Sequence, residues 1–522
     1  MIENWIKNAP HPFSTLLIAN RGEIACRIIK SCKELGITTV AIFAPNDKDS
    51  LFVSMADKSI GLSGNSITET YLNIDAILEA AKKTNSDAIH PGFGFLSERA
   101  DFARAVVAEG LVWVGPTPRS ISSMGDKVTA RLIMKNAGVP VIPGIELNET
   151  RSNQEDAVID EIQIKEAAEK IGYPILIKAS AGGGGKGMRV VHDPNELISA
   201  ANAASREAIN AFGDGKIYVE KLLETSRHIE IQILGDMYGN IIHLCERECS
   251  IQRRHQKVIE EAPSSAITPS LRQRMGSSAI AAAKASNYVG AGTVEFLVDE
   301  NENYYFLEMN TRIQVEHPIT EMITGVDIVH EQLRIASGLK LNLKQENVRI
   351  TGHAIESRIY AEDPSNGFLP AIGKLVLFKP PDGIGVRLDS GVREGDHVTP
   401  DYDPMLAKLV VHATDRNAAI RRMAYSLNTF AILGVKTNIS FLEDIIHTKE
   451  FALGNTNTNF IEKMWPNGWS DTISLEEKSH AVSAISVAEQ MGVGKQNNSY
   501  SSNQNNTQEQ NNPFFRINKT FP

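Results

Sequence analysis

What this sequence lacks narrows its class before any motif is considered. No apolar run approaches the roughly 18 residues of a membrane-spanning helix, and residues 1–15 lack the apolar centre of a secretory signal. The net charge of −10 at pH 7 leaves no broad basic surface for nucleic acid. We therefore expect a cytoplasmic protein that binds neither a membrane nor nucleic acid.

Cysteine is scarce as well. The sequence has four cysteines, and neither pair has CxxC spacing or a neighbouring pair of histidines: Cys26, Cys32, Cys245 and Cys249. Such a set predicts reduced, buried thiols and no cysteine-based metal centre. The rest of the composition, with 42% hydrophobic and 22% charged residues, is ordinary for a soluble globular protein. A chain of this length can hold about three domains.

Strands and helices alternate near the N-terminus. Residues 14–19, 38–43 and 87–90 read as short strands, and a helix after the turn Asn20–Glu23 places four apolar side chains on one face: Ile24, Ile28, Cys32 and Leu35. This order predicts a parallel sheet with ligands near the carboxyl ends of its strands. The turn itself is open to two interpretations, a phosphate loop or a purely structural βα turn.

A glycine-rich loop follows the strand Pro174–Lys178. The segment Lys178–Met188 contains five glycines, but it matches neither the Walker A pattern nor the dinucleotide fingerprint. Bare backbone N–H groups in such a loop cradle phosphate oxygens, and four consecutive glycines favour a lid that closes over a nucleotide. A plain flexible turn is the alternative, which the flanking Lys178 and Lys186 disfavour.

The most informative stretch is Tyr304–Pro318. As an extended strand it places its polar side chains on one side: Glu308, Asn310, Arg312, Gln314 and Glu316. A carboxylate and an amide oxygen two residues apart suit Mg²⁺. A guanidinium suits a planar oxyanion, and a second carboxylate beyond it suits a base. An amphipathic edge strand with a solvated face is the alternative.

Three other groups of charges stand out. A hairpin turn at 299–303 brings Glu295 close to Glu308, where two carboxylates repel unless a cation or a lysine lies between them. The basic run Arg253–Lys257 suits a polyphosphate or a second anion, although a solvated turn is the usual fate of such a run. Arg358 lies two residues from Glu356, so a structural ion pair between them is a further alternative.

Taken together and in this order, these motifs resemble those of biotin carboxylase, the ATP-grasp component of biotin-dependent carboxylases. The matching stretches are Ile18–Arg27, His90–Glu98, Met124–Lys127, the glycine loop, Gln252–Lys257, Glu308–Pro318 and Tyr402–Met405. The resemblance covers about residues 14 to 465. Within it, Phe93 stands where the family often has tyrosine, so this chain lacks the hydroxyl at that position.

The resemblance implies an α/β and α+β fold in three parts. These are an N-terminal βα domain (14–125), an ATP-grasp domain (126–335) with a mobile lid at about 145–218, and a β-rich C-terminal domain (350–465). Residues 470–522 are expected to form a helix and a disordered Asn/Gln-rich linker.

The implied reaction converts MgATP, bicarbonate and biotin into carboxybiotin, ADP and phosphate. By resemblance the ATP contacts are Lys127, Lys178, Gly184, Gly185, Glu220 to Leu223, His228, Gln252 and His255. Two Mg²⁺ or Mn²⁺ ions would bind Glu295, Glu308 and Asn310. Bicarbonate would bind Arg312, Gln314 and the Val315 backbone, with Glu316 as the base. Lys257 would steady carboxyphosphate, and Arg358 would stabilise the oxyanion that develops on biotin.

Partners follow from the same resemblance. The sequence has no Ala-Met-Lys-Met biotinylation tetrapeptide, so we expect biotin on a carrier in trans, a carboxyltransferase subunit, and a homodimer or larger complex. The chain looks most like the alpha subunits of acyl-CoA carboxylases, either truncated or with a separate carrier. The final carboxyl acceptor stays open. Two alternatives remain, another ATP-grasp ligase and a non-catalytic ATP-binding scaffold subunit.

Overall fold

The computed structural model describes residues 13–146, 160–179, 188–212, 215–254 and 256–471. The chain divides into two compact units, Met1–Gly468 and Trp469–Pro522, and all described helices and strands lie in the first. The predicted helix and linker after residue 471 fall outside the described residues, as does the glycine loop between 180 and 187. No helix within the described ranges is long and apolar enough to cross a lipid bilayer.

The N-terminal part is a five-stranded parallel sheet of order β3-β2-β1-β4-β5, as the alternation of strands and helices predicts. Its strands are β1 (Thr15–Ile18), β2 (Thr38–Phe43), β3 (Lys58–Gly61), β4 (Ala88–His90) and β5 (Val112–Trp113). Its helices are α2 (Gly22–Glu34), α3 (Leu51–Met55), α4 (Ile74–Thr84), α5 (Ala100–Ala108) and α6 (Pro118–Gly125). Helix α2 buries Ile24, Ile28 and Cys32, which confirms its predicted apolar face.

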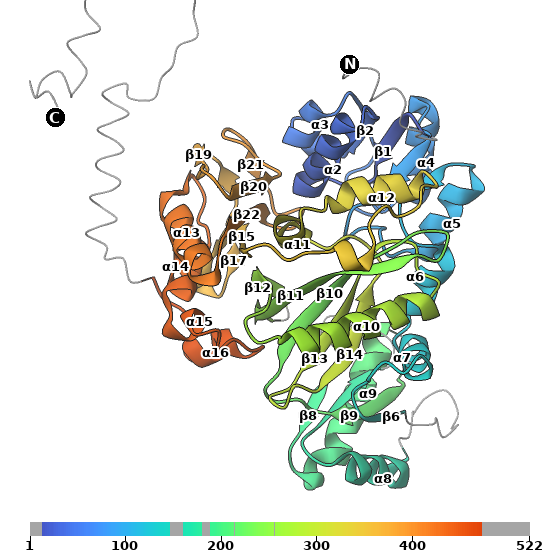
Figure 1. The fold of residues 1–522 in the computed structure, drawn as a ribbon, viewed down its shortest axis with the longest axis vertical. Coiled ribbons are helices and arrows are strands. Elements are labelled where there is room, and N and C mark those ends of the chain that lie inside the picture. The colour runs from blue at the N-terminus through green and yellow to red at the C-terminus, as the bar shows by residue number, and fades with distance from the viewer. Residues whose placement is uncertain (1–12, 147–159, 180–187, 213–214, 255, 472–522) are drawn as a thin grey trace, which may run out of the picture. The chain divides into compact units, whose positions relative to one another are not determined.

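A separate four-stranded antiparallel sheet, at the bottom of Figure 1, corresponds to the predicted lid. Its order is β6-β9-β7-β8, from Gly144–Glu146, Ile217–Lys221, Ile175–Ala179 and Arg189–Val191. Two helices accompany it, α8 (Glu161–Ile171) and α9 (Leu197–Phe212). Buried Ile175 and Ile177 of β7 belong to one apolar core with Ala201 and Ala204 of α9, so this part has an interior of its own.

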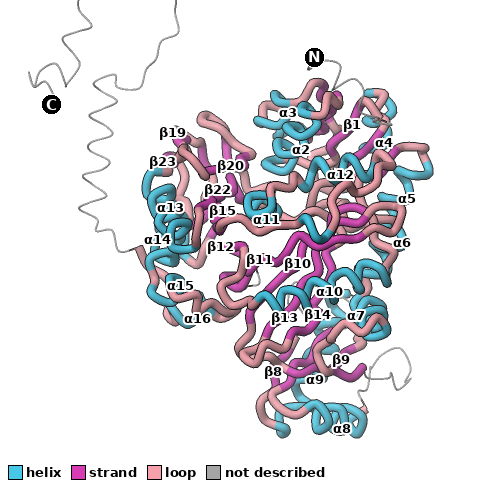
Figure 2. The backbone as a smooth tube through the Cα atoms, in the orientation of Figure 1, coloured by secondary structure: helices cyan, strands magenta, loops and turns pink. Residues whose placement is uncertain are grey.

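The largest sheet has eight strands in the order β14-β13-β10-β11-β12-β15-β22-β20 (Figure 2). Their bounds are β10 (Arg227–Gly235), β11 (Ile241–Arg253), β12 (Gln256–Ala262), β13 (Gly290–Val298), β14 (Tyr304–Asn310), β15 (His353–Tyr360), β20 (Val386–Ser390) and β22 (Met405–Ala413). Strand β12 pairs with β15 from Ile259↔Ser357 to Ala262↔Ala354. The sheet therefore runs without a break from the ATP-grasp part into the C-terminal part, and the boundary predicted between 335 and 350 stays a prediction.

The remaining α-helices of the described chain lie before, between and after the strands of this sheet in sequence. They are α7 (Lys127–Asn136), α10 (Pro269–Ala285), α11 (His317–Thr324), α12 (Ile328–Ala336), α13 (Arg416–Thr429), α14 (Ile439–His447), α15 (Lys449–Ala452) and α16 (Phe460–Met464). The remaining short strands are β16 (Glu362–Asp363), β17 (Leu369–Pro370), β18 (Gly373–Lys374), β19 (Leu377–Lys379), β21 (His397–Val398) and β23 (Ala431–Leu433).

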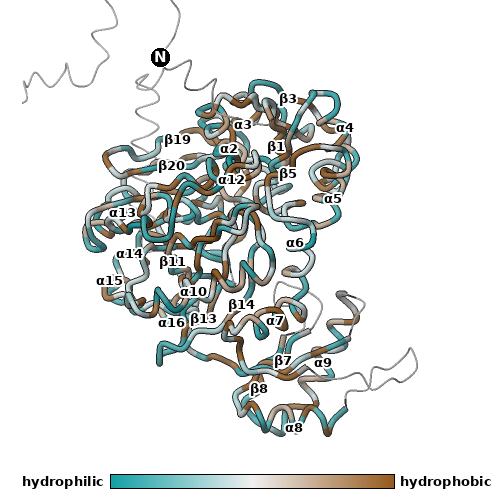
Figure 3. Tube along the Cα trace, turned by 45° about the vertical axis from the view of Figure 1, so that its right-hand side comes forward, coloured by the Kyte–Doolittle hydropathy of each residue, from teal (hydrophilic) through white to brown (hydrophobic). Residues whose placement is uncertain are grey.

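The central sheet keeps an apolar face and a polar face, because side chains alternate along each strand. On β10, Ile229, Ile231 and Ile233 share a buried core with Leu271 and Met275 of α10. In Figure 3, hydrophobic stretches of chain, coloured brown, surround the β11 label. The residues between those isoleucines point the other way, away from α10. That second face of the sheet carries the polar site.

One predicted element is wrong. The run Tyr304–Pro318 is not a single strand, because β14 ends at Asn310 and helix α11 begins at His317. The segment between them is irregular and brings Gln314 and Glu316 back over the polar face of the sheet. The predicted hairpin is confirmed, since β13 pairs antiparallel with β14 and Glu295 lies opposite Glu308.

Candidate functional site

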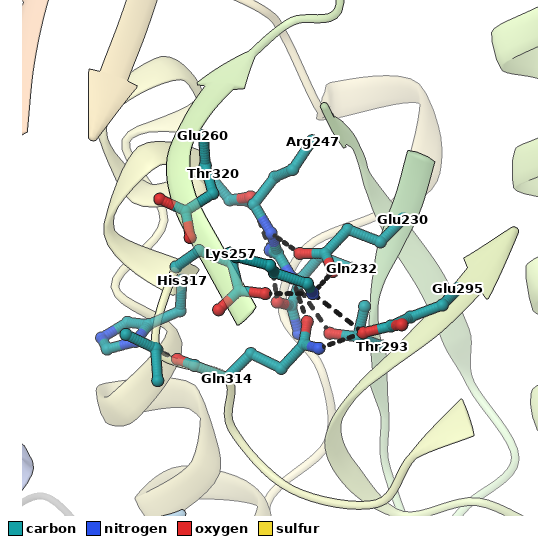
Figure 4. A network of polar contacts seen from close by, with 12 residues as sticks. Glu230, Gln232, Arg247, Lys257, Glu260, Thr293, Glu295, Gln314, His317 and Thr320 are labelled. Carbon is teal, nitrogen blue, oxygen red and sulfur yellow. Dashed lines mark hydrogen bonds and ion pairs between the residues drawn. The ribbon is translucent and has the colours of Figure 1, made fainter. Parts of the chain in front are cut away.

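The polar face of the central sheet holds an unusually dense set of buried charges (Figure 4). Strand β10 contributes His228, Glu230 and Gln232, which have exposed fractions of 6%, 0% and 0%. Glu230 lies opposite Glu295 of β13, which is also buried. Burying several carboxylates costs free energy unless cations and hydrogen-bond donors surround them, so the partners of these groups decide what the site can do.

Arg247 on β11 is the first of those partners. Its fully buried guanidinium pairs with Glu230 and donates hydrogen bonds to four neutral oxygens: Gln232 Oε1 (2.7 Å), Gln314 Oε1 (2.8 Å), Thr320 Oγ1 (2.9 Å) and Thr293 Oγ1 (3.1 Å). Neither Arg247 nor Glu230 is singled out by the sequence, where both look like the solvated side of an alternating strand. Arg247 ties β10, β13, the 311–316 segment and α11 together.

Lys257 on β12 lies at the centre of the network. Its Nζ is 2.5 Å from Glu316 Oε1, 2.6 Å from Glu230 Oε2 and 2.9 Å from Glu295 Oε1. Burial alone would lower the pKa of Lys257, but the three carboxylates raise it well above its ordinary value. Lys257 is therefore a fixed positive charge among Glu230, Glu295 and Glu316.

Glu316 is the first residue before α11 and is 2% exposed. Its second oxygen accepts a hydrogen bond of 2.9 Å from Arg358, whose Nε donates to Glu260 at 2.6 Å. Burial favours the neutral carboxyl, but Lys257 and Arg358 lower the pKa of Glu316 and keep it ionised at neutral pH. Arg358 pairs with Glu260 and Glu316, and the alternative of a local pair with Glu356 is wrong: neither Glu356 oxygen accepts a hydrogen bond from a described residue.

The carboxylates of Glu295 and Glu308 form the candidate metal site. Glu295 accepts hydrogen bonds from Asn310 Nδ2 (2.8 Å), Gln314 Nε2 (2.6 Å) and His228 Nε2 (2.8 Å). The side chain of Glu308 makes no hydrogen bond or ion pair with any described residue. Partial burial and the nearby Glu295 raise the pKa of Glu308. The rest of its side chain is in contact with solvent. Two neighbouring carboxylates, of which Glu308 has no side-chain partner among the described residues, supply oxygen ligands of the kind that a hard divalent cation prefers.

Arg312 and Val315 lie on the irregular segment beside these carboxylates. Arg312 donates to Glu98 Oε2 (2.9 Å) and Asn310 Oδ1 (2.8 Å), and Glu98 comes from the N-terminal part, where the sequence marks it only as the end of a motif. The Val315 carbonyl accepts a hydrogen bond of 2.8 Å from Lys408 of β22. The segment is thus held from the N-terminal part and from the central sheet.

Two cavities flank the network. One of about 250 Å³ is lined by Lys127, Lys178, Glu220 and apolar side chains such as Ile142 and Phe306. Lys178 and Glu220 form an ion pair on the neighbouring strands β7 and β9, and Leu223 lies just after β9. Gln252 lies on β11 near its end. His255, Gly184 and Gly185 fall outside the described residues.

The second cavity, of about 450 Å³, has Arg358 in its wall. Its walls come from the Asn20–Ile24 turn, the 93–95 turn, Arg312, Val315 and the 401–405 loop. The Arg21 guanidinium stacks 3.9 Å above the Tyr402 ring, and the Tyr402 hydroxyl donates to Asn46 Oδ1 at 2.7 Å. The Asn20 turn therefore forms a cavity wall, an outcome that its sequence left open.

The geometry brings together most of the residues singled out from the sequence. Glu295, Asn310, Gln314, Glu316, Lys257 and His228 form one contact network, which Arg358 joins through Glu316 and Arg312 through Asn310. Lys127 and Lys178 both line the 250 Å³ cavity, and Glu308 lies opposite Glu295. The cysteines are all buried and free, as predicted.

Comparison with known proteins gives three matching family models. "Biotin carboxylase, N-terminal domain" matches residues 12–121, "Carbamoyl-phosphate synthase L chain, ATP binding domain" matches 126–344, and "Biotin carboxylase C-terminal domain" matches 356–463. Biotin carboxylase 1 of Bacillus subtilis is 50% identical over 448 residues, which cover 86% of this chain and 98% of that protein.

Longer relatives and solved structures agree. The human mitochondrial propionyl-CoA carboxylase alpha chain is 47% identical over 475 residues, 91% of this chain and 64% of that protein. The chain spans 61–66% of the length of the carboxylase alpha chains that it matches. The biotin carboxylase domain dimer of Hydrogenobacter thermophilus 2-oxoglutarate carboxylase, solved with MgADP, ADP and bicarbonate, superposes with a TM-score of 0.81 at 46% identity, covering 88% of this chain and 99% of that one.

Proposed function

Because this chain belongs to the biotin carboxylase family, we propose that it carboxylates biotin, converting MgATP, bicarbonate and biotin into ADP, phosphate and carboxybiotin. The observation that carries the proposal is the place of Lys257, Glu316 and Arg358. They form one contact chain. Arg358 at one end lines the 450 Å³ cavity, and Lys257 at the other end contacts Glu295, which lies opposite Glu308, the residue after Leu307 in the wall of the 250 Å³ cavity. A group transferred from nucleotide to biotin would have to pass through this point.

On the nucleotide side, we assign the phosphates to Lys127 and Lys178. We assign the adenine to the strand end at Glu220–Leu223 and the apolar wall of the 250 Å³ cavity. His228 and Gln252 would add further contacts, as would the glycine loop and His255. Glu295, Glu308 and Asn310 would hold two Mg²⁺ or Mn²⁺ ions. Such ions neutralise phosphate oxygens during phosphoryl transfer.

In the bicarbonate step, Arg312 and Gln314 would hold the anion together with the Val315 backbone. Glu316 would accept its proton as the oxygen attacks the γ-phosphorus. The attack would displace ADP and leave carboxyphosphate as a trianion, which Lys257, held as a cation by three carboxylates, would stabilise. In the next step carboxyphosphate would break into CO₂ and phosphate, and the phosphate would take the proton of the ureido nitrogen. Arg358 would stabilise the oxyanion that this leaves on the ureido ring while the nitrogen attacks CO₂.

The low pKa of Glu316 has a mechanistic consequence. A base held by two cations is weak, so proton transfer requires Lys257 or Arg358 to move part of its charge onto substrate. Both have such a substrate in the proposed sequence, the γ-phosphate and bicarbonate oxygens that become carboxyphosphate for Lys257 and biotin for Arg358. The ion pairs of the substrate-free site would then be exchanged for substrate contacts as the reaction proceeds.

We also propose a carrier that brings biotin from outside these 522 residues, a carboxyltransferase partner, and a homodimer or larger complex. The solved relative that is described as a dimer supports the last of these. A cytoplasmic location remains our proposal. The acyl-CoA, keto acid or urea that finally receives the carboxyl group is left open.

The test is ADP release from the purified chain with MgATP and bicarbonate, with and without free biotin. We expect stimulation by biotin, and we expect Glu316→Gln to lower that rate about 10²- to 10⁴-fold, the usual contribution of a general base. Glu300→Gln, in the exposed hairpin turn, is the control and should match the native chain. MgATP binding without biotin-stimulated release would favour a scaffold subunit instead, and release driven by another acceptor would favour a different ATP-grasp ligase.

A further inference from the structure

Lys408 lies in the centre of strand β22 with none of its side chain exposed. It faces Arg358 in register on the neighbouring strand β15, so both side chains point to the same face of the sheet. Arg358 contacts the Glu316 side chain, and Lys408 contacts the backbone of the preceding residue, Val315. A buried lysine is costly unless its ammonium group is paired, so the partners of Lys408 identify its task.

The ammonium group bridges three parts of the molecule. Nζ donates a hydrogen bond of 2.8 Å to the Val315 carbonyl, lies 3.1 Å from Glu23 Oε2 at the start of α2, and lies 3.9 Å from Asp389 of β20. Asp389 is already held by two nitrogens of Arg387. Glu23 is therefore the main counter-charge, and Val315 is the backbone group that Lys408 holds.

The contact fixes a particular peptide group. In a trans peptide the carbonyl of one residue and the N–H of the next point in opposite directions. Holding the Val315 carbonyl against Lys408 therefore turns the Glu316 N–H the other way and sets the point from which the Glu316 side chain extends. The preceding peptide is held likewise, since the Gln314 carbonyl lies 2.7 Å from His317 Nδ1.

His317 cannot replace Lys408 in this task. Burial and the nearby cations Lys408, Arg27 and Arg387 lower the pKa of His317 well below its ordinary value, so its ring is neutral. The neutral ring donates to the first of the two peptides only. The second peptide, between Val315 and Glu316, depends on the ammonium group of Lys408.

We infer that Lys408 is a positioning residue for the bicarbonate step, in which it holds the Val315–Glu316 peptide where Glu316 meets bicarbonate. The inference rests on the proposed function. Its counter-ion Glu23 adds a second link, because Gly22–Ile24 form part of the wall of the 450 Å³ cavity. One buried ion pair thus connects that wall to the loop that would bind bicarbonate.

The test is steady-state ADP release with MgATP and bicarbonate varied separately, together with the melting temperature of each variant. Lys408→Met removes the donor and keeps the side-chain length. We expect KM for bicarbonate to rise or kcat to fall by about 10- to 100-fold, the effect of losing one buried hydrogen bond to a charged group. KM for MgATP should stay within about twofold, because no contact of Lys408 reaches the nucleotide cavity.

Lys408→Met also leaves Glu23 buried without its counter-charge, so the single variant is expected to be unstable. Lys408→Met combined with Glu23→Gln removes both charges and restores much of the melting temperature. Glu23→Gln alone keeps the bond between Lys408 and Val315, so it is the reference against which the double variant is compared. The positioning role predicts that the double variant melts normally and shows the bicarbonate defect in addition to any effect of Glu23→Gln alone.

Three outcomes overturn the inference. A double variant that recovers normal bicarbonate kinetics would show that Lys408 acts only through stability. An equal rise of KM for MgATP and for bicarbonate would show a general disturbance of the fold. A native chain with no bicarbonate-dependent ADP release would overturn the proposed function itself, and that result is read from the native chain before any variant is compared.

Discussion

Replacing Arg247 tests whether the buried network holds the site together. Arg247→Met keeps most of the side-chain volume but removes an ion pair with Glu230 and four hydrogen bonds. Breaking a buried pair by removing one partner costs about 3–5 kcal/mol. Lys257 still contacts Glu230, which places the expected loss toward the lower end of that range.

At about 2 °C per kcal/mol, the lower end for chains of a few hundred residues, the melting temperature should fall by roughly 6–10 °C. Differential scanning calorimetry at a fixed scan rate measures it. Adding Glu230→Gln removes the uncompensated carboxylate, so the double variant should recover part of the loss. Lys83→Met, which removes an exposed ion pair on α4, is the control and should not change the melting temperature.

Two results would refute the reasoning. A fall of less than about 2 °C for Arg247→Met would mean that water replaces the guanidinium at little cost. A double variant no more stable than the single one would mean that the Glu230 charge is not the source of the loss. Biotin-dependent ADP release should fall in both variants, because Gln314 loses the donor that orients its side chain.

Two further predictions concern Glu260 and Tyr402. Burial and the nearby Glu316 raise the pKa of Glu260 to about 7, although Arg358 lowers it. Between about pH 4.5 and 7 the folded chain therefore binds one proton more than the unfolded chain. The folded chain loses stability as the pH rises through that window. In Glu260→Gln this loss disappears, so the melting temperature of the variant minus that of the native chain should increase from pH 5 to 7.5; a constant difference would contradict the shift. If biotin binds in the 450 Å³ cavity, which Arg21 and Tyr402 line, then Tyr402→Leu removes the aromatic ring that Arg21 stacks on. The variant should raise KM for free biotin up to about 30-fold and leave KM for MgATP unchanged. An unchanged KM for biotin would show that biotin binds elsewhere.

Much of the fold follows from local patterns in the sequence. Alternating strands and helices predicted the parallel N-terminal sheet, and the hairpin turn at 299–303 predicted the opposition of Glu295 and Glu308. Both depend on interactions between neighbouring segments. The end of β14 at Asn310 did not follow, because polar residues continue to alternate after it with no glycine before Pro318 to mark a break.

The buried network shows what local patterns leave out. Glu230 alternates with isoleucines on β10, which is the pattern of a solvated strand face, and only the fold reveals that Lys257 and Arg247 cover it. Arg358 likewise has a carboxylate two residues away in sequence, but it pairs with carboxylates 42 and 98 residues distant. Charge type and spacing predicted which residues matter, while their partners depend on long-range strand order.

The unbroken eight-stranded sheet also bears on how such a chain can be cut and recombined. Lys257, Glu295, Arg358 and Lys408 all stand on strands of this one ladder, so their spacing is set by backbone hydrogen bonds. A chimera joined between residues 344 and 356 would follow the boundary between two matching family models and still divide β12 from β15. The described strands and helices of the four-stranded sheet with α8 and α9 have by contrast a core of their own, so exchanging this part between relatives would replace Lys178 and Glu220 in the wall of the 250 Å³ cavity while leaving the ladder intact.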